Sequence, residues 1–137
     1  MSLYELLAER QYPAAVDAPR NARRLVTGAL NGIDTSTVEA TVLATSELTT
    51  NAVSHALGPF GLRLLVGADV IRIEVSDSSP SLPTVQPVSI LRGGGRGLSI
   101  VEQLATSWGV MVQHHRPGKV VWCEIAICPK GEPPANA

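Results

Sequence analysis

Three polar residues recur at every fourth position in the segment from Ser46 to Ala56: Glu47, Asn51 and His55. The segment predicts a helix, and this spacing places a carboxylate, an amide and an imidazole along one side of it. Acid and amide oxygens directed at one point suit Mg²⁺ that arrives with a phosphate-bearing substrate. The alternative is an ordinary helix with a polar flank. His55 is more typical of a capping or core-edge histidine than of a catalyst.

Two further features point to a nucleotide. The run Gly93-Gly94-Gly95-Arg96-Gly97 precedes a predicted helix, and backbone N–H groups at such a helix start attract phosphate; a flexible hinge is the alternative. Asp77 ends a predicted strand on its apolar, helix-facing side. There it can accept a hydrogen bond from the exocyclic amine of adenine, or simply cap a turn. Leu98 breaks the dinucleotide fingerprint, and Val120 after Gly118-Lys119 breaks the P-loop pattern.

Composition sets the limits on the fold and on the ligands. The 137 residues are 45% hydrophobic and 17% charged, which predicts one domain over residues 1–128 and a flexible tail over 129–137. A net charge of −1 argues against direct nucleic-acid binding. No apolar run reaches the roughly 18 residues of a membrane span. Cys123 and Cys128 are predicted on opposite faces of a strand, as free thiols in a reducing cytoplasm.

The apolar pattern predicts an α+β fold: a two-layer sandwich with a mixed, mostly antiparallel sheet and three helices on one face. The second helix, capped by Asp34 or Ser36, is expected to bury an apolar arc beside Glu47 and Asn51. The first helix carries three arginines whose predicted position is a solvated face. The expected helices are 18–30, 35–56 and 98–104, the expected strands are 10–13, 61–67, 70–76, 107–113 and 119–127, and 78–92 is expected to be a lid. The arc consists of Val38, Val42, Leu48, Ala52, Val53 and Ala56, and the arginines are Arg20, Arg23 and Arg24.

Three motifs follow one another along the chain: the helix with Glu47 and Asn51, the strand-end Asp77, and the run from Gly95 to Leu98. In this order they resemble the N, G1 and G2 boxes of the GHKL (histidine-kinase-like) ATPase superfamily, above all its anti-sigma-factor serine/threonine kinase branch. The likeness extends from Arg10 to about Ile127 and implies a Bergerat-type ATP-binding fold. It implies that Glu47 is the catalytic residue, as the base or water-holder that activates the attacking hydroxyl, that Asn51 binds Mg²⁺ and that Asp77 accepts from adenine. It also implies that the phosphates are contacted by Gly93, Gly95, Arg96, Gly97 and Leu98.

The resemblance implies ATP and Mg²⁺ as cofactors, and a sigma factor and an antagonist (anti-anti-sigma) protein as partners, with a homodimer as the assembly. The sequence departs from the pattern at two places. The stretch Asp77-Ser78-Ser79-Pro80-Ser81 lacks both G1 glycines, and Val120 replaces a threonine that helps to hold adenine. These departures favour a second hypothesis, a non-catalytic module that binds a sigma factor or antagonist with or without nucleotide. An ATPase without a protein substrate is the third.

Overall fold

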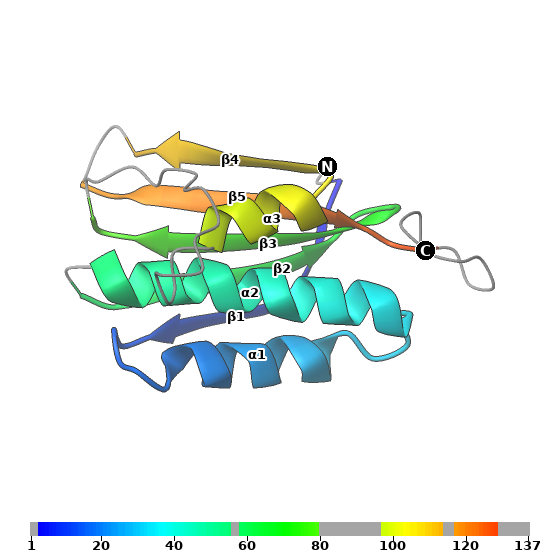
Figure 1. Ribbon diagram of the computed structural model, residues 1–137, viewed down its shortest axis with the longest axis horizontal. Helices are drawn as coiled ribbons and strands as arrows, with labels where there is room; N and C mark the ends of the chain where they lie inside the picture. Colours follow the sequence, from blue (N-terminus) through cyan, green and yellow to red (C-terminus); the bar gives the residue numbers. More distant parts are fainter. Residues whose placement is uncertain (1–2, 56–57, 80–96, 114–116, 129–137) are drawn as a thin grey trace.

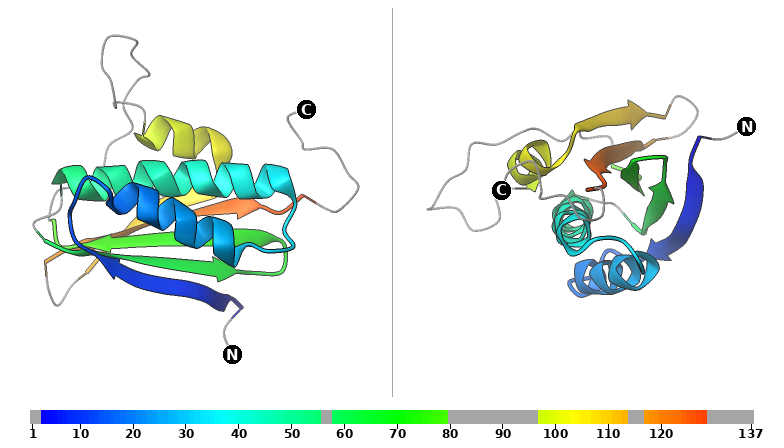
Figure 2. Two further views of the ribbon diagram at one scale, coloured as in Figure 1. Left: turned by 90° about the horizontal axis from the view of Figure 1, so that it is seen from below. Right: turned by 90° about the vertical axis from the view of Figure 1, so that its right-hand side faces the viewer.

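The computed structural model of the chain describes residues 3–55, 58–79, 97–113 and 117–128. Its centre is a five-stranded sheet with the strand order β1-β2-β3-β5-β4, in which every pair of neighbouring strands runs antiparallel. Three helices cover one face of this sheet (Figure 1, Figure 2). The predicted α+β two-layer fold is confirmed.

The bounds of the elements agree closely with those predicted, apart from the first strand. The strands are β1 (Glu5–Tyr12), β2 (Phe60–Val66), β3 (Val70–Asp77), β4 (Ser107–Val112) and β5 (Lys119–Ala126). The helices are α1 (Ala18–Ala29), α2 (Thr35–His55) and α3 (Gly97–Leu104).

Strand β1 is longer than the edge strand predicted at 10–13. Its pairing with β2 continues back to Glu5, with a shift in register between Leu6 and Ala8. Within the strand only Tyr12 is buried. An edge strand with an irregular register and no consistent buried face lacks the alternation by which a strand is recognised in a sequence.

The hydrophobic core fills the space between the helices and the sheet. Strand β3 alternates: Ile71, Ile73 and Val75 are buried, and the residues between them are half-buried. Helix α1 turns an apolar stripe to the sheet, with Ala22 and Val26 fully buried. The removal of these apolar faces from water is the main contribution to the free energy that holds the two layers together.

The buried face of α2 is made largely of threonine, which corrects the predicted apolar arc. Thr41, Thr45 and Thr49 each donate the side-chain hydroxyl to the carbonyl oxygen four residues back, over 2.7, 2.8 and 2.7 Å. These bonds satisfy the hydroxyls within the helix, so that the methyl groups can pack in the core. The predicted arc has Leu48 and Ala52 buried but Val38, Val42 and Val53 only half-buried, and Ala56 lies outside the described residues.

Asp34 is the residue that caps α2. Its carboxylate accepts the backbone N–H of Thr37 at 2.9 Å, in the manner of an N-cap side chain. It also accepts the hydroxyls of Thr37 and Ser36. The side chain of Thr37 in turn accepts the backbone N–H of Cys128 at 3.1 Å, which ties the segment after β5 to the start of α2.

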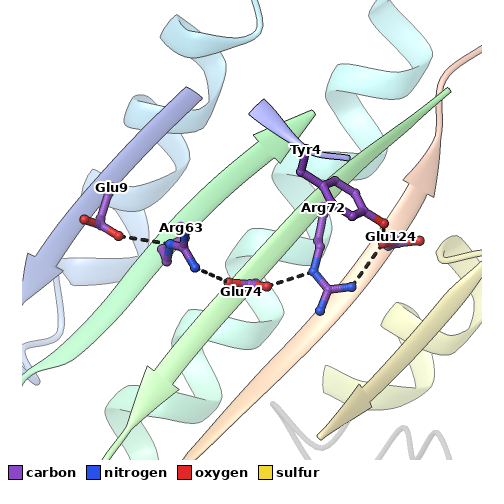
Figure 3. A network of polar contacts seen from close by, with 6 residues as sticks. All are labelled: Tyr4, Glu9, Arg63, Arg72, Glu74 and Glu124. Atoms are coloured by element: carbon purple, nitrogen blue, oxygen red, sulfur yellow. Dashed lines mark hydrogen bonds and ion pairs between the residues drawn. The ribbon is translucent and has the colours of Figure 1, made fainter. Parts of the chain in front are cut away.

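The sheet face opposite the helices carries a chain of charges. Arg63 pairs with Glu9 and Glu74, and Arg72 pairs with Glu74 and Glu124 (Figure 3). Tyr4 adds a hydrogen bond to Glu124. The guanidinium of Arg72 also lies 4.2 Å from the ring centroid of Trp122, and this stacking shields its ion pairs from water. This open face of the sheet therefore carries a connected network of ion pairs.

Candidate functional site

The elements that carry the predicted site residues meet at one end of the molecule. The C-terminal half of α2, the end of β3, the beginning of β5 and the beginning of α3 all lie toward this end, on the left in Figure 1 (see also Figure 2). Helix α2 packs on α3 and on both strands. The fold thus brings together segments that are far apart in the sequence.

Glu47 and Asn51 lie one turn apart on α2 and are both half-buried. His55, the last residue of the helix, is exposed. The polar row therefore leaves the shielded part of the helix at His55, in agreement with a helix-end role for that residue. The two oxygen-bearing side chains keep positions in which partial shielding from water strengthens electrostatic contacts.

Arg23 contributes a contact next to this row that the sequence did not indicate. Its guanidinium donates to the hydroxyl of Ser46 at 3.0 Å, which links α1 to the residue before Glu47. The predicted solvated face is correct for Arg20 and Arg24, which are exposed, but wrong for the half-buried Arg23. The short polar side chain of Ser46, facing another helix, was the only signal that could have indicated this contact.

Asp77 is almost wholly enclosed, with 4% of its side chain exposed. It stands directly opposite Lys119 of β5, and the ammonium group of Lys119 lies 2.9 Å from Oδ1 of Asp77. The backbone N–H of Ser79 donates to the same oxygen at 2.8 Å. Lys119 reaches the carbonyl of Ser79 as well, at 3.4 Å. A buried ion pair with further hydrogen bonds on both partners is the arrangement in which burying two charges is tolerated.

Lys119, rather than residue 120, is the β5 residue that faces Asp77. Val120 pairs with Ser76, and successive residues of a strand point to opposite faces, so Val120 belongs to the open face of the sheet. The expectation that Val120 removes a hydroxyl from the adenine end is therefore wrong. The apolar alternation of β5 could have indicated this. Val121 and Cys123 point to the core, and counting back by two residues places Lys119 on the same face.

Gly118 fixes the approach of these strands. Its φ is +129°, and a Cβ on this residue would lie 2.4 Å from the carbonyl oxygen of Asp77. Only glycine permits both the backbone conformation and the close contact. The backbone before Lys119 is therefore pressed against the end of β3 at Asp77.

The remaining predicted site residues belong mostly to a part of the chain that is not described. Gly93, Gly95 and Arg96, and the lid from residue 80 onward, lie outside the described residues. Gly97 is the first residue of α3, and Leu98 is 3% exposed. Because the side chain of Leu98 packs in the core, any contact of this residue with a phosphate would use its backbone N–H.

Among the described residues there is no group of three or more His, Cys, Asp or Glu side chains that could hold a metal ion by itself. Asn51 offers one amide oxygen. Mg²⁺ usually retains waters and binds through one or two protein oxygens together with substrate phosphates. The available side chains therefore fit a magnesium ion bound as a nucleotide complex, and do not form a complete protein cage.

The two cysteines are free, as predicted. Burial raises the pKa of Cys123 to about 12, so this thiol stays protonated at neutral pH. Cys128 follows β5 and is half-buried, with Ser36 donating to its sulfur. None of the helices in the described part of the chain combines the length and apolar character needed to cross a bilayer.

Residues 12–125 match the family model of the histidine kinase-like ATPase domain. Since the match covers most of the chain, the protein belongs to this family. Among solved structures, the RsbU and RsbW domains of Rv1364c from Mycobacterium tuberculosis match with a TM-score of 0.64 and 21% sequence identity. The match covers 88% of this chain but 32% of that one, so the chain spans about a third of the length of that protein. No curated protein matches the sequence.

Proposed function

We propose that this protein binds Mg-ATP and acts as an anti-sigma-factor serine/threonine kinase of the cytoplasm. The observation that carries the proposal is the joint placement of Glu47 and Asn51 on α2 and of Asp77 at the end of β3, at one end of a histidine kinase-like ATPase domain. The order of the boxes along the chain and the fold shared with a structure that contains an RsbW domain support the same reading.

The roles follow from the chemistry of each side chain. Asn51 would hold Mg²⁺, which would neutralise charge on the transferred phosphoryl group. Asp77 would accept from the adenine amine, and the backbone of Gly93, Gly95, Arg96, Gly97 and Leu98 would lie against the phosphates. Phosphoryl transfer depends mainly on positioning and charge stabilisation, which a half-buried polar row can supply.

Glu47 would accept the proton of the attacking serine hydroxyl. The hydroxyl oxygen then forms a bond to the γ-phosphorus, the bond to the β-phosphate oxygen breaks, and ADP leaves. A phosphate on the antagonist protein adds a double negative charge at its interface, which changes its affinity for the kinase. The sigma factor would be released or retained accordingly. In the described sheet β1 is an edge strand, and it is the surface at which we expect a homodimer to form.

The test is a transfer assay with ATP labelled in the γ-phosphate and purified candidate antagonist proteins. Glu47→Gln keeps the shape of the side chain and removes its basicity, so it should reduce transfer at least about 100-fold. Glu39→Gln is the matched control, because Glu39 is an exposed residue of the same helix two turns earlier. Wild-type transfer that Glu47→Gln leaves unchanged would refute the catalytic role.

A non-catalytic binding module is the second candidate. The observations that favour it are the missing G1 glycines after Asp77 and the presence of Lys119 on the Asp77 carboxylate. In that case nucleotide binding, if measurable, would not be followed by transfer to any antagonist. An ATPase without a protein substrate would instead release phosphate steadily, and Asn51→Ala would abolish the release.

A further inference from the structure

The two oxygens of the Asp77 carboxylate differ in their hydrogen bonds. Both the ammonium group of Lys119 and the backbone N–H of Ser79 donate to Oδ1. Neither of these bonds uses Oδ2. Two donors on one oxygen fix the rotation of a carboxylate about its χ2 bond, so the direction of the other oxygen is fixed as well.

We infer that Lys119 is a positioning residue for base recognition: it holds the Asp77 carboxylate in one orientation, so that Oδ2 is the oxygen that accepts from the 6-amino group of adenine. This inference rests on the proposed nucleotide site. In this inference Lys119 fixes the geometry at the adenine end of the site. Lys119 acts through Asp77 and does not need to touch the base.

The charges around the pair support this role. Asp77 and Lys119 have only 4% and 6% of their side chains exposed, and a charge-assisted hydrogen bond in such an enclosed place holds its two partners in a defined geometry. Among the described residues, Lys119 provides the ion pair to Asp77. Of the elements packed nearby, the C-terminal half of α2 carries Glu47 and His55 as titratable groups, and α3 carries Glu102. Two of these are carboxylates, which accept hydrogen bonds and do not replace the ammonium of Lys119 as a donor to Asp77.

The rigid backbone around the pair supports it as well. Lys119 is held directly opposite Asp77 by the pairing of β3 with β5, and Gly118 brings the preceding backbone onto the Asp77 carbonyl. Its second contact, to the carbonyl of Ser79, connects the ammonium to the turn that follows β3. Lys119, at the start of β5, thus contacts both the last residue of β3 and the turn that follows it. Two such contacts hold the carboxylate more firmly than a single ion pair.

The test is the discrimination between ATP and purine riboside triphosphate, which lacks the 6-amino group, measured by calorimetry with Mg²⁺. We expect wild-type protein to bind ATP at least about 10-fold more tightly, the ratio typical of a hydrogen bond to a charged acceptor. Lys119→Met should reduce the ratio to within about 2-fold, because the carboxylate loses the donor that orients it. Lys119→Arg keeps a cation and should restore most of the ratio. A general loss of folding would weaken both nucleotides equally and leave their ratio unchanged.

Val120→Thr is the matched control, since this neighbour points to the other face of the sheet and should leave the ratio as in wild type. Lys119→Gln, which removes the charge-assisted hydrogen bond to Asp77, replaces Lys119→Met if that variant does not fold, and should lower the ratio. A wild-type ratio retained in a folded Lys119→Met or Lys119→Gln variant overturns the inference alone. Equal binding of both nucleotides by wild type overturns it together with the role of Asp77. Binding of neither overturns the nucleotide site itself.

Discussion

Asp77 and Lys119 form a buried ion pair across the ends of β3 and β5, with the ammonium nitrogen 2.9 Å from one carboxylate oxygen. The two residues are 42 positions apart in the sequence. The pair exists because the antiparallel register of two strands brings the last residue of one opposite the first residue of the other. It makes the end of the sheet a polar site within an otherwise apolar layer.

Gly118 is expected to be essential for this geometry. Gly118→Ala places a Cβ 2.4 Å from a backbone oxygen at a φ of +129°, so it should lower the free energy of unfolding by about 2 kcal/mol or more. Gly28→Ala is the control, because nothing lies within 4 Å of a Cβ there. That change, inside α1, should be neutral or stabilise by up to about 1 kcal/mol. Urea denaturation measures both, and equal stabilities would contradict the geometry.

The cap of α2 should contribute measurably to stability. Asp34→Ala removes the acceptor for the Thr37 N–H and should cost about 1 kcal/mol. Asp17→Ala is matched to it, because Asp17 precedes α1 without a side-chain capping bond. Its effect should be close to zero. A loss for Asp17→Ala as large as that for Asp34→Ala would contradict the assignment of the cap.

The same carboxylate gives a pH dependence of known sign. Hydrogen bonds from Thr37 lower the pKa of Asp34 in the folded protein. The stabilisation is therefore fully present above the unfolded pKa of about 4 and is lost as the pH falls through the lower folded value. The difference in unfolding free energy between wild type and Asp34→Ala should be larger at pH 7 than at pH 2. An equal difference at both values would contradict this origin.

The periodic burial in β3 and α1 could be predicted from the sequence, but the threonine stripe of α2 and the partner of Asp77 could not. The alternation in β3 and the stripe in α1 were predictable because burial imposes periods of 2 and 3.6 residues. The threonine stripe was not, since a hydroxyl counts as polar until its bond to the carbonyl four residues back is known. The partner of Asp77 depended on the register of a strand far along the chain, which no local pattern specifies.

Arg72 and Arg63 should differ in their contribution to stability, although each makes two ion pairs (Figure 3). The side chain of Arg72 is 15% exposed and that of Arg63 is 48% exposed. Arg72→Ala removes the cationic partner that two partly buried carboxylates, Glu74 and Glu124, share and should cost about 2 kcal/mol. Arg63→Ala should cost less than about 1 kcal/mol, because water and salt screen exposed pairs. Equal costs in urea denaturation would contradict the shielding of Arg72 by Trp122.

The two thiols should react at very different rates. Because the pKa of Cys123 is about 12, its thiol is protonated at pH 8, and burial also keeps reagents away. Native protein should therefore release one equivalent of coloured thiolate from a chromogenic disulfide reagent, through Cys128. Protein unfolded in urea should release two equivalents. Cys128→Ser should abolish the native reaction. Rapid reaction of that variant in the native state would contradict the burial of Cys123.

Calorimetric titration of the purified protein with ATP, in the presence and absence of Mg²⁺, tests directly whether Asn51 of α2 and Asp77 of β3 belong to one Mg-ATP site, as we propose. Wild type should bind ATP with magnesium, and Asn51→Ala should lose at least about 10-fold in affinity by removing the metal's protein ligand. Asn31→Ala, a change to an exposed asparagine after α1, should bind as wild type does. Absence of binding at millimolar ATP, or unchanged binding by Asn51→Ala, would contradict the claim.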